Sequence, residues 1–385
     1  MESGFVIKRA ETKKAVEATE SEAQPKYRMI FESLKGAIQS GDYRPGGRLP
    51  SEAQLVRRFG ASRMTIVKAI RELQDLGLVE RKVGSGTYVA SRSSEKSLRF
   101  GLLIPELGQT EIFEPVCQGM ANSPLARNHS LMWGSSISDS EQKEKAALQM
   151  CQQYIDQGAS GVFFAPLEFT PSMHEVNRRI VSELDRAKVG VVLLDRCVGP
   201  YPQRSQYDLV GIDNHAAAYI ATSHLVKCGA RRVAFFRRPF SAPTVDARVT
   251  GYREALFTHS MQSQENLVTV GDPGDEALVK SILFSQKPDA FLCGNDITAA
   301  KLMQSLLNIG IKIPEEVRIV GFDDIKYASL LPIPLTTQHQ PCLDIGAIAM
   351  RTMLDRLQSP DLPVREISLN CKLVIRKSCG GQNLP

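Results

Sequence analysis

The stretch SEAQLVRRFGASRMTIVKAIRELQDLGLVERKVGSGTYVA, residues 51–90, decides the fold of the first part of the chain. Ser51 can cap a helix that ends at Gly60, and Ser62 can cap a second helix. The second helix carries apolar side chains at helical spacing on one face: Ile66, Ala69, Ile70 and Leu73. The residues that follow alternate on both sides of Gly84-Ser85-Gly86, which predicts two short strands joined by a tight loop.

Upstream of this stretch, the sequence after Pro25 predicts one more helix. Its apolar residues recur every three or four positions: Tyr27, Ile30, Phe31, Leu34 and Ile38. The Gly/Pro-rich segment 41–50 ends this helix. Three helices and a β-hairpin within residues 24–90 predict a winged helix-turn-helix domain, since the short Phe59–Ser62 turn sets two helices against each other. Residues 1–23 have few large apolar groups and are expected to form a flexible tail.

The charge of this region predicts a nucleic-acid partner. Residues 26–92 hold 13 Lys and Arg against six Asp and Glu, a net +7, although the whole chain carries only +5. Arg63 and Thr65 begin the third helix and are expected to read base edges, because arginine matches the acceptors of guanine. Basic neighbours are expected to contact phosphates, and the wing glycines to let backbone approach the DNA. The predicted DNA-binding residues are Arg57, Arg58, Ser62, Arg63, Thr65, Lys68, Arg81, Lys82, Gly84 and Gly86. A winged helix used for protein contacts is the alternative.

A set of short motifs runs through the same region. They are Gly41-Asp-Tyr-x-Pro-Gly-x-x-Leu-Pro-Ser-Glu52, Phe59-Gly-Ala-Ser-Arg-x-Thr65 and Gly84-x-Gly86-Thr-Tyr-Val. Together they resemble the GntR-type winged helix over residues 26–90, which implies a double-stranded DNA operator as partner. One position departs from the family. Val67 stands where the family usually carries an arginine, with Lys68 beside it, so the operator sequence does not carry over.

The rest of the chain predicts an α/β architecture. The polar segment 91–97 is expected to be a linker. From RFGLLIP at residue 99 to VRIVGFD at residue 317, apolar strands alternate with helical or loop sequence. Such runs indicate parallel sheets that are buried on both faces, and the length of residues 98–385 favours two of them.

Composition and motifs exclude several classes of protein. No signal peptide and no stretch of about 18 apolar residues is found, so a cytoplasmic protein is expected. The eight cysteines form no Cys-x-x-Cys pair and have no histidines at zinc spacing, so no metal site is predicted and most cysteines are expected to be small buried residues. No phosphate-binding glycine loop, Gly-x-Ser-x-Gly or His-Glu-x-x-His follows residue 98, so neither an enzyme nor a cofactor is expected.

Polar residues follow three of the apolar strands. They are Asp195-Arg196, Asn295-Asp296 and Asp323-Asp324. Because ligands of open α/β sheets bind at the carboxyl ends of strands, these groups are expected to converge on a polar ligand. Each pair by itself is more typical of a helix N-cap, and a structural role is the interpretation we favour for Asp324.

Longer motifs connect these strand ends. They are LLDR at 193–196, VGIDNHAAAYIATSHLVKCGARRVAFF at 210–236, Arg248-x-x-Gly-Tyr252, PDAFLCGND at 288–296 and GIKIPEEVRIVGFDDIKYASLLPIPLTTQHQP at 310–341. They resemble the LacI/GalR sensor, which has the periplasmic-binding-protein fold of type I. The resemblance implies two Rossmann-like lobes joined by three crossovers, an effector in the cleft and a homodimer. The expected lobes are residues 98–229 with 338–358, and 230–337 with 359–385.

Arg248, Asn295 and Asp323 match effector-contacting positions of that family. An arginine and carboxylates can bond adjacent sugar hydroxyls, and Phe322 or Trp133 can offer a stacking face, although Trp133 is expected in the core rather than the cleft. The predicted effector-binding residues are Glu106, Asp195, Arg196, Arg248, Asn295, Phe322 and Asp323. The hinge helix of LacI-type proteins has no counterpart in residues 91–97, so the coupling mechanism does not carry over.

The sequence thus predicts a multidomain α/β transcription regulator, and the resemblance to the LacI/GalR sensor alone implies that a small polar ligand relieves repression. A homodimer is expected to bind a pseudo-palindromic operator, and a sugar is the expected effector. A co-repressor or a protein effector remains an alternative, as does a cytoplasmic solute-binding protein. An aminotransferase fused to the winged helix would need a Schiff-base lysine, whereas the strands here end in Asp and Asn.

Overall fold

The computed structural model describes residues 26–82, 85–90, 97–104, 112–134, 140–261 and 267–381, with only the backbone at residues 140–142. The predicted tail 1–23, almost all of the predicted linker 91–97, Gly84 and Glu106 lie outside these residues. The chain divides into two compact units, residues 1–95 and 96–385.

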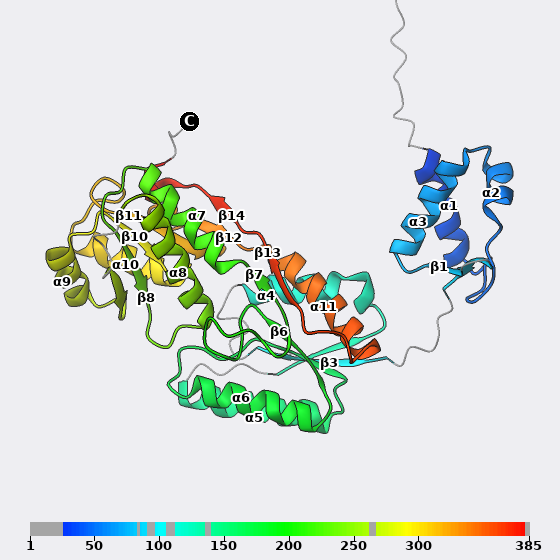
Figure 1. Ribbon diagram of the computed structural model, residues 1–385, viewed down its shortest axis with the longest axis horizontal. Coiled ribbons are helices and arrows are strands. Elements are labelled where there is room, and N and C mark those ends of the chain that lie inside the picture. The colour runs from blue at the N-terminus through cyan, green and yellow to red at the C-terminus, as the bar shows by residue number, and fades with distance from the viewer. Residues whose placement is uncertain are drawn as a thin grey trace, which may run out of the picture. The chain divides into compact units, whose positions relative to one another are not determined.

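The first unit has the three helices and the hairpin that the sequence predicts (Figure 1). They are α1 (Lys26–Gln39), α2 (Glu52–Phe59), α3 (Arg63–Asp75), β1 (Val79–Lys82) and β2 (Gly86–Val89). Ser51 caps α2 in a capping box, in which its hydroxyl accepts from the Gln54 amide and the Gln54 side chain accepts from the Ser51 amide. Gly60 ends the helix in the left-handed conformation at φ 56°. The helices enclose one core with Leu34, Leu55, Ile66 and Leu73 at its centre.

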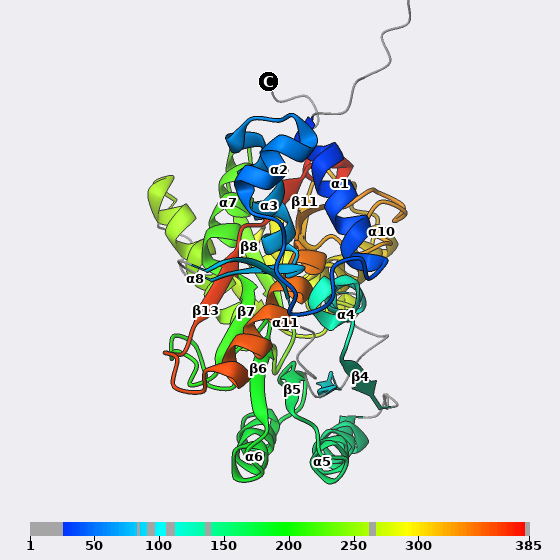
Figure 2. The ribbon, with the colours of Figure 1, turned by 90° about the vertical axis from the view of Figure 1, so that its right-hand side faces the viewer.

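The second unit begins with a fully parallel sheet in the order β13-β7-β6-β5-β3-β4. Its strands are β3 (Arg99–Leu103), β4 (Ser130–Trp133), β5 (Gly161–Phe164), β6 (Gly190–Leu194), β7 (Asp208–Ile212) and β13 (Glu366–Leu369). One face is covered by α4 (Phe113–Asn122) and α11 (Cys342–Gln358), the other by α5 (Ser140–Asp156) and α6 (Met173–Arg186). Figure 2 shows α5 and α6 below β5 and β6. Phe163 and Phe164 enter opposite cores, as the alternation of a strand requires. This sheet and its helices, with the short η1 (Pro124–Ala126), are lobe 1.

A second sheet has the order β14-β12-β11-β10-β8-β9, with only β14 antiparallel. Its strands are β8 (Val233–Arg237), β9 (Val268–Val270), β10 (Ala290–Cys293), β11 (Arg318–Asp323), β12 (Thr336–His339) and β14 (Lys372–Val374). Helices α7 (Asn214–Lys227) and α8 (Pro243–Thr258) cover one face, α9 (Glu276–Gln286) and α10 (Asp296–Asn308) the other. This sheet, its helices and η3 (Lys377–Cys379) are lobe 2.

The chain passes three times between the lobes, from β7 to α7, from β12 to α11 and from β13 to β14. This order corrects two of the expected lobe boundaries. Helix α7 belongs to lobe 2, because it packs with α8 and places Ala221 and Leu225 in that core. Strand β13 belongs to lobe 1, because it pairs in parallel with β7. No helix of the described residues is both long and apolar enough to span a bilayer.

Candidate functional site

The start of α3 presents the predicted base-reading residues. Ser62 caps the helix, and its hydroxyl lies 2.8 Å from that of Thr65. The Arg63 side chain is 79% exposed, and its Nε donates to Glu52 of α2 over 3.0 Å. The same Glu52 carboxylate also binds Arg81 of the wing strand β1. One carboxylate therefore aligns two arginines, one from the helix and one from the wing, on the surface that the helix-turn-helix motif presents to DNA.

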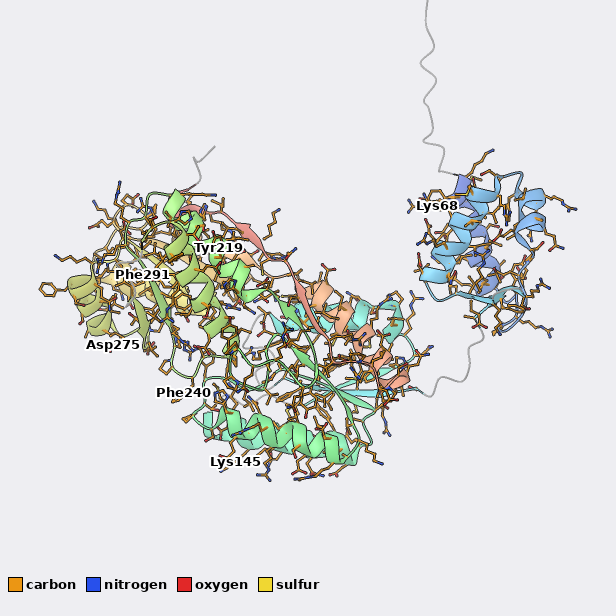
Figure 3. The ribbon with its side chains drawn as sticks, in the orientation of Figure 1. Lys68, Lys145, Tyr219, Phe240, Asp275 and Phe291 are labelled. Carbon is orange, nitrogen blue, oxygen red and sulfur yellow. The ribbon has the colours of Figure 1, made fainter. Side chains whose placement is uncertain are left out.

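The predicted phosphate-contacting residues all lie on the surface: Arg57, Arg58, Lys68, Arg81 and Lys82. Several are held by neighbours. Arg58 donates to the Tyr43 hydroxyl over 2.9 Å, and the Lys68 ammonium lies 3.8 Å from the centre of the Tyr27 ring (Lys68 is labelled in Figure 3). Lys82 pairs with Glu80. Lys68 is thus held by α1, Arg58 by the segment that follows α1, and Lys82 by a neighbour in its own strand β1.

Two residues that the sequence analysis did not select belong to this surface. Met64 is 77% exposed at the second position of α3, where an apolar side chain can contact a thymine methyl group. Arg48 folds over the wing at Gly86, where an added Cβ would lie 2.8 Å from its Nε. Gly86 also has φ 127°, so glycine is required there for two reasons. For Met64, the sequence signal is an apolar residue beside Arg63 that is not part of the apolar face Ile66, Ala69, Ile70 and Leu73.

In the second unit, Arg248 of α8 contacts residues at the carboxyl ends of three strands, β7, β10 and β11. Its Nε donates to Asn214 Oδ1 over 2.8 Å and its Nη1 to the Gly294 carbonyl over 2.5 Å. Asp323, at the end of β11, lies 3.8 Å away. The guanidinium also stacks 3.6 Å from the centre of the Phe322 ring. Arg248 is thereby fixed with its charge at the carboxyl edge of the lobe 2 sheet.

The lobe 1 side of the cleft is built around Arg196. It forms ion pairs with Glu168 and, over 3.0 Å, with the neighbouring Asp195. Glu168 in turn accepts from the backbone amide of Ala242 in lobe 2. The backbone amide of Phe169 donates to the carbonyl of Phe240, which Figure 3 labels in the loop between β8 and α8. Both bonds link the two lobes beside the cleft.

The carboxylates in the cleft are strained and partly unpartnered. Asp195 and Asp323 have positive φ angles of 67° and 119°, which costs energy and is typical of functional sites. Among the described residues, Asp195 Oδ1 is buried without a hydrogen-bond partner. Burial raises the pKa of Asp323 to about 7, while the Arg248 guanidinium acts to lower it and the Asp195 carboxylate to raise it further. The site therefore has acceptor capacity that the protein itself does not use.

These side chains line one cavity of about 40 Å³ between the lobes. Its lining residues are Ile112, Glu168, Asp195, Arg196, Thr244, Val245, Arg248, Asn295, Ile297, Asp323 and Ile325. Larger hollows of about 360 and 280 Å³ flank it and share Asp195 and Asp323 with it, respectively. Pockets for drug-sized ligands measure about 300–1,000 Å³, so the small cavity is too small for such a ligand in this arrangement of the lobes.

Five of the seven predicted effector-binding residues meet in this cavity: Asp195, Arg196, Arg248, Asn295 and Asp323. Asn295 is at the same time the N-cap of α10, bound to the Thr298 amide. Phe322 is not available for stacking, because it is fully buried and Arg248 covers its ring. Trp133 was expected in the core, but it lies on the edge strand β4 and is 69% exposed.

The other two strand-end aspartates have structural partners. Asp296 is fully buried and accepts from the Thr337 hydroxyl over 2.6 Å, and burial raises its pKa. Asp324 pairs with Arg376 over 2.7 Å and with His339 over 3.0 Å. Asp324 is thus bound within the protein, although it is not a helix cap.

Three residues of the cleft were missed by the sequence analysis: Glu168, Asn214 and Gln340. Glu168 follows the apolar strand β5, so the rule that selected the other strand ends could have found it. Gln340 donates to Asp323 Oδ1 over 2.7 Å from a crossover segment. Asn214 comes two residues after β7, so the same rule could have found it. No local pattern marks Gln340, because its role depends on how the crossover brings it to Asp323.

The fold and the two sites define a class: a DNA-binding transcription regulator with a two-lobed, periplasmic-binding-protein-like second unit. Residues 26–89 match the family model of bacterial regulatory proteins of the gntR family, and residues 222–379 match the periplasmic binding protein-like domain. The chain thus combines a gntR-family DNA-binding domain with the sensor fold of LacI/GalR regulators.

The chain is similar to transcription regulators over most of its length. The chain is 24% identical over 368 residues to the arabinose metabolism transcriptional repressor of Geobacillus stearothermophilus, covering 92% of this chain and 97% of that protein. The solved structure of the regulator CelR in complex with cellobiose aligns with a TM-score of 0.62 at 22% identity, over 92% of this chain and 100% of that one. The regulator GntR from Chromobacterium violaceum aligns with a TM-score of 0.58 at 25% identity, over 74% and 100%.

Proposed function

We propose that this regulator is a repressor of sugar metabolism whose affinity for its operator is lowered by a neutral, hydroxyl-rich ligand in the interlobe cleft. The observation that carries the proposal is the buried Asp195 Oδ1, which has no partner among the described residues. Such an oxygen is costly to bury unless a donor reaches it, and a ligand hydroxyl is a suitable donor.

The charges of the cavity support a neutral ligand over an anionic one. Three carboxylates line it, those of Glu168, Asp195 and Asp323, against the guanidinium groups of Arg196 and Arg248. Their formal sum is one negative charge when Asp323 is ionised and zero when it is protonated, so the cavity has no excess positive charge to attract a sugar phosphate or a sugar acid. Arginine and carboxylate side by side match the donor and acceptor character of adjacent hydroxyls. The arabinose repressor and the cellobiose complex named above add support for a sugar.

The partners follow from the same proposal. A homodimer would present two α3 helices to a pseudo-palindromic, double-stranded operator, with Arg63, Thr65 and Met64 at the bases. The protein acts in the cytoplasm and catalyses no reaction. Effector and operator oppose each other through a coupling of about 1–3 kcal/mol, that is, a 5–150-fold change in either affinity.

Two measurements test this function with the full-length protein. In vitro selection from a random duplex library identifies the operator. Thermal unfolding with L-arabinose, D-ribose, D-glucose, cellobiose and D-ribose 5-phosphate then identifies the effector, because a ligand of the folded state raises the melting temperature. We expect a neutral sugar to raise the melting temperature and to lower operator affinity 5–150-fold.

Matched variants assign the effect to the cleft. Arg248→Met should abolish the sugar-induced rise in melting temperature, whereas Asp361→Asn, an exposed position outside the cavity, should leave it unchanged. If a sugar strengthens operator binding, the ligand is a co-repressor, and the proposed decrease in operator affinity is wrong. If only the phosphate ester binds, the charge argument is wrong.

A further inference from the structure

A cluster of three metal-ligating side chains lies in lobe 2, in a part of the molecule that the proposed function does not use. His224 stands in the last turn of α7, Cys228 caps that helix, and Cys379 ends η3. On α7 the cluster lies beyond Tyr219, which Figure 3 labels. The His224 nitrogen and the two sulfur atoms all lie within 4.8 Å of one another. The sequence analysis predicted no metal site, because it found no Cys-x-x-Cys pair and no histidine at zinc spacing. It did not use the four-residue spacing of His224 and Cys228, and Cys379 lies 155 residues from His224.

The distances in the cluster match those around a single tetrahedral ion. His224 Nε2 lies 3.2 Å from Cys379 Sγ and 3.4 Å from Cys228 Sγ. Zinc–sulfur bonds of about 2.3 Å and zinc–nitrogen bonds of about 2.0–2.1 Å place tetrahedral nitrogen and sulfur ligands about 3.5 Å apart. Both nitrogen–sulfur distances lie within about 0.3 Å of this value, and the two sulfur atoms are no more than 4.8 Å apart.

The surroundings of Cys379 favour a thiolate. The sulfur accepts from the Thr336 hydroxyl over 3.1 Å and from the Gly381 amide over 3.3 Å. Such donors to a ligand sulfur or to its neighbours orient the ligand and tune its charge. Arg318 also acts electrostatically on Cys228. Two thiolates and one divalent cation sum to zero charge, so this arginine does not oppose binding of the ion.

Gly381 packs closely against one face of the cluster. A Cβ at Gly381 would lie 2.7 Å from Cys228 Sγ and 3.0 Å from His224 Nε2, so any larger residue would press on two of the three ligands. Cys228 is only partly buried, whereas His224 and Cys379 are buried. A water molecule can therefore complete the coordination from the side of Cys228.

We propose that His224, Cys228 and Cys379 bind one Zn²⁺ ion, with a water as the fourth ligand. Binding takes Zn²⁺ from solution, releases the two thiol protons and uses the neutral imidazole. The ion holds residues 376–381 against the end of α7, the helix whose first residue, Asn214, binds Arg248 in the cleft. A helix of 14 residues spans about 21 Å, so the metal acts on the fold of lobe 2 and not on the effector directly.

Cobalt is a suitable probe, because tetrahedral Co²⁺ with thiolate ligands has visible d–d bands and a near-ultraviolet charge-transfer band. Full-length protein is reduced with a phosphine, stripped with EDTA, desalted and titrated with CoCl₂, after which ZnCl₂ is added. We expect one equivalent of Co²⁺ with both spectral features, displaced by one equivalent of Zn²⁺. A wild-type protein that gives no tetrahedral thiolate spectrum overturns the proposal.

Three variants assign the site. Cys228→Ser and His224→Gln each remove a ligand, and we expect at least a 100-fold loss of affinity, because losing even a hydrogen-bond partner of a ligand costs about 10–100-fold. Cys117→Ser, on α4 of lobe 1, is the matched control and should bind like the wild type. Circular dichroism of the metal-free proteins checks that each variant is folded. If folded Cys228→Ser and His224→Gln bind Co²⁺ as tightly as the wild type, or if Cys117→Ser loses affinity for Co²⁺, the metal site lies elsewhere.

Discussion

Replacing Asp195 by Asn should separate effector binding from stability. Asp195 Oδ2 accepts from Arg196 over 3.0 Å, and Oδ1 has no partner among the described residues. A hydrogen bond to a charged group contributes about 1.5–3 kcal/mol. Since about 1.4 kcal/mol corresponds to a tenfold change, Asp195→Asn should raise the Kd for the effector sugar about 10- to 100-fold.

The ligand-free variant should stay as stable as the wild type. The substitution preserves shape and leaves the Arg196–Glu168 ion pair in place. It also reduces three cavity-lining carboxylates to two, opposite two arginines. A net change within about 1 kcal/mol shifts the melting temperature by no more than about 4 °C for a domain of this size.

The assay is isothermal titration of wild type, Asp195→Asn and Asp361→Asn with the sugar that raises the melting temperature, combined with thermal unfolding without ligand. Asp361→Asn makes the same chemical change at an exposed position and should match the wild type in both. An unchanged Kd for Asp195→Asn would remove Asp195 from the effector site. A fall of more than about 10 °C in the ligand-free melting temperature would instead make it a structural residue.

Three further predictions concern DNA, pH and the lobe 1 core. Arg63→Ala should lower the binding free energy for the selected operator by about 1–3 kcal/mol and relax the preference for particular bases. Arg57→Ala should weaken binding to all duplexes alike and reduce the slope of log affinity against log salt concentration by about 1. Fluorescence anisotropy at about 50–200 mM salt measures both variants, and an equal loss of affinity for operator and random DNA in Arg63→Ala contradicts base reading. Burial raises the pKa of Asp323 to about 7, above the unfolded value of about 3.9, so the folded state keeps a proton that the unfolded state loses. Stability should therefore fall as pH rises from about 4 to 7, and Asp323→Asn should flatten this dependence in urea titrations; equal slopes for the two proteins contradict it. The Asp208 side chain is fully buried and is bound by two arginines, one of which is about a third exposed. Asp208→Ala leaves these arginines without their carboxylate and should lower the free energy of unfolding by about 3 kcal/mol. Urea titration measures this change, and Asp361→Asn is the control that should be unaffected.

Local sequence signals determined the elements of this protein. Ser51, Gly60 and Ser62 mark the helix ends of the first unit, because caps and a left-handed residue act on their immediate backbone neighbours. The apolar runs predicted the buried strands, and the polar residues after them predicted a site at the carboxyl ends of strands. Asp195 and Asp323 do line one cavity, because the carboxyl edges of the two sheets, at β6 of lobe 1 and β11 of lobe 2, both border the space between the lobes.

Tertiary structure decided how distant elements combine. Strand β13 is four residues long and only half-buried, so no apolar run showed that it pairs with β7. Phe322 ends an apolar strand as expected, yet Arg248 occupies its open face. Trp133 lies on an edge strand, where a residue of its type is not forced inward. Such outcomes depend on contacts across lobes and crossovers, which no local periodicity encodes.

Helix α7 shows the difference between what local sequence specifies and what the tertiary structure specifies. The start of this helix is specified locally, because the Asp213 side chain accepts from the Ala216 amide three residues further on. Only the fold brought its first residue to Arg248 and its last turn to Cys379. The physical reason is that a helix is specified by neighbours one turn apart, whereas these contacts depend on the packing of segments 34 residues apart, for Asn214 and Arg248, and 155 residues apart, for His224 and Cys379.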